Sequence, residues 1–380
     1  MLRPYACVLN GEVRWGVEVE VIDGVITRVG IQSGVPDDYI LCPAFVNAHS
    51  HMEYRGLMGR VGGDDFFAWI REITEQKSQQ ELDQVRRDCQ IAANENRATG
   101  VGYIWEHTDR LGSAAAMRAA GLDGILFQEL ITFNEHENPG EKWASVHERA
   151  AQQAKEGGFP VYVNPHAIYT VDDASLTKIA SRAGPISIHC AESRFERELT
   201  VHGSGKFAEF QRAHGWKVVA SGLSPIAVLN GYGMLKSTTQ LVHCCDVDDS
   251  DIKRIAQRRA SVAHCPRSNQ RLACPTAPVR RMLDAGIRVG LGMDSAASSG
   301  PIDMFEEMRA ALAASRRRGE PLTGEQVLDM STAGGARSLG LSGWEIKEGS
   351  TVPLIKIVVD SCHTAEDLIE TGSPGCVQWV

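Results

Sequence analysis

The stretch Leu41-Cys42-Pro43-Ala44-Phe45-Val46-Asn47-Ala48-His49-Ser50-His51 places two histidines at the end of an apolar run. Such a run is typical of a buried β-strand, in which alternate side chains point to the same side. His49 and His51 therefore face one way and Ser50 faces the other. Two imidazoles on one face can bind the same metal ion. An isolated pair of this kind is more often inert, so the rest of the chain has to supply further ligands.

This run is the first of eight, and the stretches between them mix charged and apolar residues as surface helices do. The runs are Ala44 to His49, Val101 to Glu106, Gly124 to Leu130, Pro160 to His166, Ile186 to Cys190, Thr239 to His243, Ala260 to Cys265 and Arg288 to Asp294. Strands that alternate with helices indicate a parallel sheet, and eight such units predict an α/β fold of the (β/α)8 TIM-barrel type.

The two ends of the chain are rich in short strands instead. Asn10-Gly11 and Asp23-Gly24 separate apolar runs, and such pairs favour hairpin turns because both residues tolerate positive φ. Thr351 to Asp360 and Gly375 to Val380 are again strand-like, the first through its β-branched residues. We infer that the two termini meet.

A chain of 380 residues is long enough for one large barrel with a smaller appendage. We expect residues 1–42 and 341–380 to form a small β-sandwich and residues 43–340 to form the barrel.

The composition is that of a globular protein with a small-molecule substrate. The hydrophobic fraction is 43%, and the net charge of −9 argues against nucleic acid or an anionic membrane as a partner. The first residues lack a signal peptide and no run approaches the length of a membrane span, so we expect a cytoplasmic protein. Ten cysteines without a CxxC pair favour free thiols. The oligomeric state stays open, a homo-oligomer included.

Polar residues capable of chemistry stand at or near the ends of the predicted strands. They are His49, His51, His166, His189, Glu192, His243 and Asp294. A (β/α)8 barrel brings these strand ends to one rim, so the residues should converge. His49, His51, His189 and Asp294 together would form a site for one Zn²⁺ or Fe²⁺ ion with a place left for water.

A bound divalent ion lowers the pKa of its water from about 16 towards about 7 and supplies hydroxide at neutral pH. Attack of the metal-bound hydroxide on an unsaturated C–N carbon needs a proton shuttle, which Glu192 is placed to provide. His243 is expected to hold or polarise the nucleophile, and Asp294 to accept the water proton.

Each residue alone also has a purely structural interpretation. The spacing of His189 and Glu192 is common, His243 fits a core histidine, and Asp294 fits a helix cap. The remaining histidines, His107 among them, are predicted to lie on the surface or in loops. Joint occurrence at successive strand ends is what favours the metal site.

Five motifs resemble the amidohydrolase superfamily, in its cytosine-deaminase-like and chlorohydrolase-like branch. They are Pro43 to His51, Ile188 to Glu192, Leu241 to Cys244, His264 to Asn269 and Gly292 to Ser295. The resemblance covers nearly the whole chain. It implies metal ligands at His49, His51, His189 and Asp294, a proton-shuttling Glu192 and a water-contacting His243.

One departure from the superfamily concerns the number of metal ions. Members with two metals carry a carboxylated lysine at the end of the fourth strand, but Val161 to His166 contains no lysine. We therefore expect one divalent ion, with zinc as the first expectation and iron as the alternative, because both accept these ligands.

The substrate expectation also rests on resemblance. Pro165 to Val171 is similar to adenosine-type deaminases, in which the histidine that matches His166 contacts the nucleoside. Cys265 to Asn269, followed by Asp294 to Ser298, is most like the aminodeoxyfutalosine deaminases of the alternative menaquinone biosynthesis pathway.

That substrate is an adenine nucleoside with a benzoate arm, so a cation at the rim would be useful. Arg267 is the candidate, because guanidinium pairs with carboxylate bidentately, and a loop-bracing role is the equal alternative. Glu53 is expected to contact the purine or ribose. Trp105 is expected to stack on the substrate, with a place in the core as the alternative.

The sequence thus predicts a metal-dependent hydrolytic deaminase of an amino-purine nucleoside, aminodeoxyfutalosine first, that releases ammonia. The alternatives among enzymes are other C–N or C–Cl hydrolases of the branch, acting on adenosine or S-adenosylhomocysteine, guanine, a formimino compound or a triazine. From another class, the alternative is a non-catalytic barrel that binds a metabolite. The presence of Glu192 argues against it.

Overall fold

The computed structural model describes residues 1–63, 65–133, 139–359 and 362–380. Two parallel sheets lie at its centre, with strand orders β6-β7-β8-β9 and β10-β11-β12-β13. The strands are β6 (Phe45–Ser50), β7 (Val101–Thr108), β8 (Asp123–Leu130), β9 (Val161–Pro165), β10 (Ile186–Cys190), β11 (Thr239–His243), β12 (Ser261–His264) and β13 (Val289–Leu291). Each of the eight predicted runs overlaps one of these strands.

Two parallel bridges join the sheets into one barrel. Ala167, just after β9, pairs with His189, and Ser50 pairs with Asp294, just after β13. The α/β class predicted from the alternating runs is therefore confirmed. In this architecture the carboxyl ends of all the strands open onto one face.

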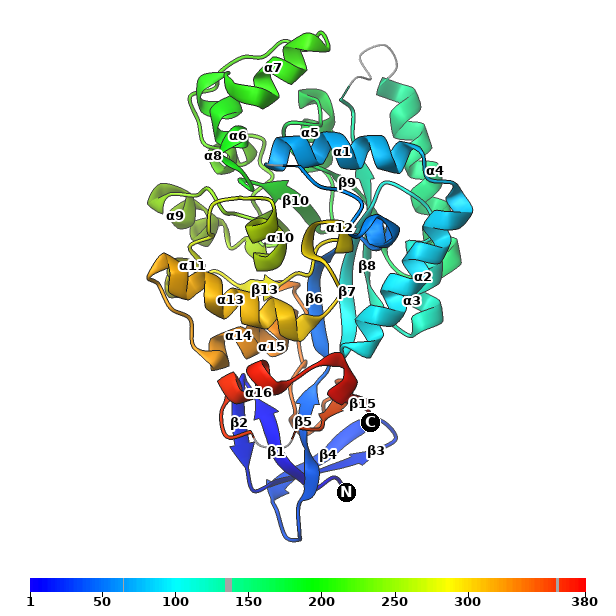
Figure 1. Ribbon diagram of the computed structural model, residues 1–380, viewed down its shortest axis with the longest axis vertical. Helices are drawn as coiled ribbons and strands as arrows, with labels where there is room; N and C mark the ends of the chain where they lie inside the picture. Colours follow the sequence, from blue (N-terminus) through cyan, green and yellow to red (C-terminus); the bar gives the residue numbers. More distant parts are fainter. Residues whose placement is uncertain (64, 134–138, 360–361) are drawn as a thin grey trace.

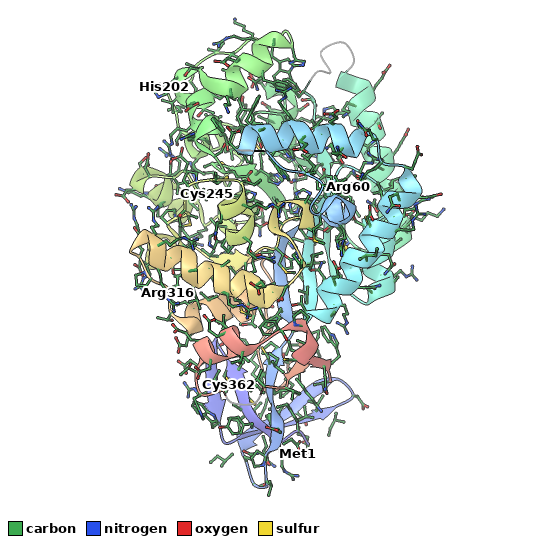
Figure 2. All side chains as sticks on the ribbon, in the orientation of Figure 1. Met1, Arg60, His202, Cys245, Arg316 and Cys362 are labelled. Carbon is green, nitrogen blue, oxygen red and sulfur yellow. The ribbon has the colours of Figure 1, made fainter. Side chains whose placement is uncertain are left out.

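Helices cover the outside of the barrel (Figure 1), and side chains fill the space between them and the strands (Figure 2). Up to β11 they are η1 (Met52–Leu57), α1 (Phe66–Ser78), α2 (Leu82–Ala98), α3 (Ser113–Ala120), α4 (Pro139–Gly157), α5 (Asp173–Ala180), α6 (Arg194–Arg197), η2 (Glu198–His202), α7 (Gly205–Ala213) and α8 (Pro225–Gly231). After β11 follow α9 (Asp249–Arg258), α10 (Pro266–Arg271), α11 (Val279–Asp284), α12 (Ala296–Ser299), α13 (Met304–Arg318), α14 (Gly324–Ser331), α15 (Ala333–Ser338), α16 (Ala365–Thr371) and η3 (Pro374–Cys376).

Helix α1 is the element that matters most for the site, because it crosses the barrel near the ends of β9 and β10 (Figure 1). It begins after Asp65, whose side chain accepts a hydrogen bond from the Ala68 amide at 3.0 Å and so caps the helix. At the other end, Lys77 Nζ lies 2.8 Å from Asp109 Oδ2. Arg110 donates to the carbonyl oxygens of Lys77 and Gln80. The C-terminal end of α1 is thus held against the residues that follow β7.

The N- and C-terminal segments share one five-stranded sheet with the order β15-β14-β5-β1-β2, and β3 and β4 form a separate hairpin. The strands are β1 (Pro4–Leu9), β2 (Glu12–Trp15), β3 (Val17–Ile22), β4 (Val25–Ile31), β5 (Asp37–Pro43), β14 (Leu354–Ile357) and β15 (Val377–Trp379). Strand β14 pairs with β5 in antiparallel register, so the two termini meet as inferred. Asp360, the end of the strand-like stretch in the sequence, lies outside the described residues.

The turns between these strands have the predicted backbone. Asn10 and Gly11 have φ values of 53° and 81°, and Asp23 and Gly24 have φ values of 48° and 76°. The hairpin packs on the sheet through an apolar cluster that contains Val19, Ile26 and Leu41. The limits 1–42, 43–340 and 341–380 for a sandwich and a barrel stay a prediction.

Two further sequence expectations concern the state of the cysteines and the presence of membrane spans. All ten cysteines are unpaired. Among the helices of the described residues, none is long and apolar enough to cross a membrane.

Candidate active site

The histidine pair lies at the end of β6, where the first and last strands of the barrel meet. The Asn47 side-chain oxygen accepts hydrogen bonds from the amides of His49 at 3.3 Å and Met293 at 3.0 Å. The Asp294 amide donates to the His49 carbonyl at 2.9 Å. These bonds hold the Asp294 carboxylate beside the imidazole of His49, with 3.7 Å between Oδ1 and Nε2.

The four residues expected to bind a metal converge. His51 Nε2 lies 3.3 Å from His189 Nε2, and the ring centroid of His49 is 4.9 Å from those of both His51 and His189. Groups of candidate ligand atoms lie within 4.8 Å of one another, among them His49, His51 and Asp294. The structure thus brings the predicted set together, and its role as a ligand set is a proposal.

The donor chemistry of this set fits a divalent ion of the zinc or iron type. Both ring nitrogens of His49 are buried and have no hydrogen-bond partner among the described residues. Burial lowers the pKa of His49 well below its usual value, so the imidazole is neutral and free to act as a ligand. Three imidazole nitrogens and one carboxylate oxygen suit Zn²⁺ or Fe²⁺.

Glu192 and His243 form a contact beside this set. Glu192 Oε1 lies 3.4 Å from His243 Nε2. Burial raises the pKa of Glu192 well above its usual value, and the carboxylates of Asp294 and Glu196 raise it further. Burial lowers the pKa of His243 to about 4. At neutral pH His243 is therefore uncharged, and burial favours the protonated form of Glu192.

Several of these residues have left-handed backbone conformations, which side chains other than glycine rarely adopt. The φ values are 52° for Ala191, 75° for His243, 48° for Cys244 and 53° for Asp294. Such residues persist where the surrounding structure holds them in place, and they cluster at functional sites. The strand ends of β10, β11 and β13 are shaped in this way to aim Glu192, His243 and Asp294.

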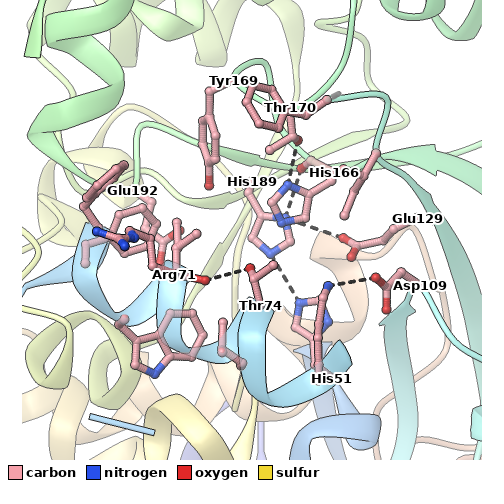
Figure 3. A pocket seen from close by; sticks show the side chains of 18 of the residues that line it. His51, Arg71, Thr74, Asp109, Glu129, His166, Tyr169, Thr170, His189 and Glu192 are labelled. Atoms are coloured by element: carbon pink, nitrogen blue, oxygen red, sulfur yellow. Dashed lines mark hydrogen bonds and ion pairs between the residues drawn. The ribbon is translucent and has the colours of Figure 1, made fainter. Parts of the chain in front are cut away.

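A pocket of about 630 Å³ opens over these residues. Helix α1 forms one wall, and His166 and Tyr169 contribute to another (Figure 3). Phe207 also lines the pocket. The ring centroid of His166 is 4.7 Å from that of His189, and His166 Nδ1 lies 2.9 Å from Thr170 Oγ1. His166 is thus placed where a bound molecule can reach it, in line with its predicted role.

Three residues that were predicted to contact the substrate are not among the described residues that line the pocket. Arg267 donates to the Pro301 carbonyl at 2.7 Å and lies 3.9 Å from Glu307 Oε2, so it braces a loop. Trp105 is buried, and its ring centroid is 4.9 Å from that of Phe127 in the core. Glu53 is buried in η1 behind His51, with 3.9 Å between Oε1 and Nδ1.

Other residues at the site went unnoticed in the sequence. His107 was expected on the surface or in a loop, and this is wrong: it is buried in β7 with its ring centroid 4.3 Å from that of His49. Glu129 lies at the end of β8 and lines the pocket. Both stand near strand ends, so the rule that found His243 was also able to find them. Arg71 of α1 lines the pocket as well, but the helix itself was not predicted.

Comparisons with known proteins agree with this geometry. The model of the amidohydrolase family matches residues 40–360. A 5-methylthioadenosine/S-adenosylhomocysteine deaminase of Haloquadratum walsbyi is 30% identical over 342 residues, which cover 85% of this chain and 72% of that protein.

Solved structures share the fold. An adenosine deaminase from Xanthomonas campestris with bound zinc superposes with a TM-score of 0.82 at 23% identity, covering 99% of this chain and 90% of that chain. Aminofutalosine deaminase of Helicobacter pylori in complex with methylthio-coformycin has a TM-score of 0.82 at 21% identity and 99% coverage of both chains.

Proposed function

This chain belongs to the amidohydrolase family, and from that premise we propose that it is a metal-dependent hydrolytic deaminase of adenosine-type nucleosides. The observation that carries the proposal is the buried Glu192, whose pKa is raised by burial and which lies beside both the imidazole of His243 and the predicted metal-ligand set. A hydrolase acting on a ring C–N bond needs such an acid, because the ring nitrogen has to gain a proton as water adds to the carbon.

The metal is assigned to His49, His51, His189 and Asp294, as one divalent ion. When bound, such an ion lowers the pKa of a water molecule and so makes a nucleophile available at neutral pH. The absence of a lysine in β9 supports one ion rather than two.

The chain's own groups move the protons. Glu192 donates its proton to the ring nitrogen next to the reacting carbon, while the Asp294 carboxylate accepts a proton from water. His243 presents Nε2 towards Glu192 and orients the attacking water. The bond from the carbon to the amino group then breaks, and ammonia leaves with the proton that Asp294 returns. Glu192 regains a proton from the new hydroxyl group as this group becomes the carbonyl oxygen. The net reaction consumes one water, and an oxygen replaces the amino group.

We infer further that the substrate is aminodeoxyfutalosine. The motifs around Arg267 and Asp294 support it, as does the fold shared with the Helicobacter pylori enzyme. The pocket also suits an adenine nucleoside with an aryl arm that carries a carboxylate. Tyr169 and Phe207 stack at 4.3 Å in its wall, and the exposed Arg71 lines it with no ion-pair partner within the described part of the chain.

A second candidate is a 5′-thio-substituted adenosine, which the 30% identical relative from Haloquadratum walsbyi favours. Both candidates share the adenine ring at which Glu192 acts and differ only in the arm attached to the ribose.

The test measures ammonia release by the zinc-loaded protein from adenosine, 5-methylthioadenosine, S-adenosylhomocysteine and aminodeoxyfutalosine. We expect turnover of at least one, with the highest kcat/KM for aminodeoxyfutalosine. Glu192→Gln serves as the matched control and should keep its zinc while kcat falls by about 10²–10⁴. If no nucleoside of the panel releases ammonia, or if Glu192→Gln stays active, the proposal is wrong.

A further inference from the structure

Glu129 presents a buried oxygen that nothing in the described chain satisfies. Its side chain is 2% exposed, it lines the pocket, and Oε1 has no hydrogen-bond partner among the described residues. A buried carboxyl oxygen without a partner is costly, since it has lost its hydrogen bonds to water. A bound molecule that donates to it would remove this cost.

The neighbouring histidine does not fill this role. His189 Nδ1 lies 3.0 Å from the carbonyl oxygen of His166, so it carries a proton and donates it there. The distance from His189 Nδ1 to Glu129 Oε1 is 3.7 Å, which is beyond hydrogen-bond range. Because the backbone already fixes the proton of His189, Glu129 is not needed to orient this ring.

The same geometry argues against a second metal ion at Glu129. His51, Glu129 and His189 do form one of the groups with ligand atoms within 4.8 Å of one another. The protonated Nδ1 of His189 is not available as a ligand, however, and the Nε2 atoms of His51 and His189 already face each other at 3.3 Å. Glu129 is therefore left to face the pocket.

The nearby cation is also engaged elsewhere. Lys77 of α1 lies 2.8 Å from Asp109 Oδ2 and 3.3 Å from the Tyr54 hydroxyl. Lys77, Asp109 and Tyr54 all line the pocket with Glu129. This wall thus combines an ion pair with two carboxyl oxygens that have no hydrogen-bond partner among the described residues, Asp109 Oδ1 and Glu129 Oε1. Asp109 is held by Lys77, so Glu129 is the carboxyl group that is left for a ligand with hydrogen-bond donors.

We propose that Glu129 binds the 2′- and 3′-hydroxyl groups of the substrate's sugar, so that the pocket selects ribonucleosides over deoxyribonucleosides. This inference rests on the proposed function. Glu192 and Glu129 lie on opposite sides of the His51–His189 pair (Figure 3). A nucleoside that presents its ring nitrogen to Glu192 has hydroxyl groups as its remaining strong donors, and a carboxyl group with two oxygens matches a vicinal pair of hydroxyls.

The experiment compares kcat/KM for adenosine and 5-methylthioadenosine with that for their 2′-deoxy and 3′-deoxy analogues. Burial raises the pKa of Glu129 to about 8, so its carboxyl group is largely uncharged at neutral pH. The wild type should therefore prefer the ribonucleosides by about threefold to tenfold, the value of a hydrogen bond between uncharged groups. Glu129→Met, which removes both oxygens, should abolish this preference, and Glu129→Gln, which keeps one acceptor and supplies donors, should retain part of it.

Glu307→Gln is the matched control, because Glu307 is also buried and also has one unpartnered oxygen, but does not line the pocket. Its preference for ribonucleosides should equal that of the wild type. Zinc content and Tm are measured for every variant.

The outcomes separate this inference from the proposed function. A wild type that deaminates no nucleoside contradicts the function itself. A wild type that deaminates both sugars equally well overturns the role of Glu129, as does a Glu129→Met variant with unchanged preference. Loss of zinc from Glu129→Gln would make Glu129 a metal ligand and would overturn it too.

Discussion

The side-chain amide of Asn269 lies 2.9 Å from Nδ1 of His243. An amide N–H can only donate, so His243 Nδ1 accepts and carries no proton. Since burial keeps this imidazole neutral at physiological pH, its single proton is on Nε2, the nitrogen that lies 3.4 Å from Glu192 Oε1. Asn269 therefore fixes the tautomer of His243, with the imidazole proton on Nε2.

Replacement of Asn269 by leucine should free His243 to adopt the other tautomer. We expect kcat/KM to fall by about tenfold to a hundredfold, as is typical when a residue that orients a site imidazole is lost. Nitrogen-15 NMR of the imidazole should show the shift of the proton to Nδ1, which a merely structural role would not produce. Gln270→Leu, at the exposed next position, is the control and should leave both readouts unchanged.

The two arginines near the rim should respond in opposite ways. Arg71→Ala should raise KM about tenfold for aminodeoxyfutalosine, whose arm carries a carboxylate, and leave KM for adenosine unchanged. Arg267→Ala should leave both KM values unchanged and lower the free energy of unfolding by about 1 kcal/mol, because its hydrogen bond to the Pro301 carbonyl is lost. The reverse pattern would restore Arg267 as a substrate contact.

Removal of the metal should destabilise the protein as well as inactivate it. The buried nitrogens of His49 have no other partner among the described residues, so zinc binds the folded state specifically. At a free zinc concentration of about a hundred times Kd, the stabilisation is about 2.7 kcal/mol, and it should appear as a higher Tm than in the presence of a chelator. Asp294→Ala should lose most of this zinc-dependent rise in Tm. A rise of wild-type size in that variant would remove Asp294 from the ligand set.

Some residues of the site could be predicted from the sequence and others could not, because their positions depend on different features of the chain. His49 and His51 share a face because strand side chains alternate, and His189, His243 and Asp294 meet them because a parallel barrel collects its strand ends. Local periodicity and one rule of topology are enough for these residues. The strands β6 to β13 follow from the same two sources.

Contacts across the barrel could not be predicted in this way, because they depend on the directions that side chains take after packing. Arg267 follows a predicted strand end, yet it turns away to Pro301 and Glu307. Asn269 lies within a recognised motif, but its partner His243 is on another strand. Helix α1 begins with an Asp65 cap that the sequence displays. Its position over the pocket, however, depends on the distant Asp109 and Arg110.

The last prediction concerns stability and pH, and it follows from Glu307 in α13. Burial raises the pKa of Glu307 to about 8 from its ordinary value of 4.5, and outweighs the attraction of Arg267 at 3.9 Å. Between about pH 4.5 and pH 8 the folded protein therefore keeps a proton that the unfolded chain has released. By linkage, the free energy of unfolding decreases as pH rises through this window, by up to about 1.4 kcal/mol per pH unit.

Glu307→Gln removes this group from the titration. The free energy of unfolding is measured in urea at pH 5, 6, 7 and 8 for both proteins. The value for the wild type minus the value for Glu307→Gln should decrease steadily as pH rises. Glu306→Gln, at an exposed position of the same helix, should give a difference that is constant over this range. Equal slopes for wild type and Glu307→Gln would mean that Glu307 is ionised in the folded protein, with Arg267 rather than burial controlling its pKa.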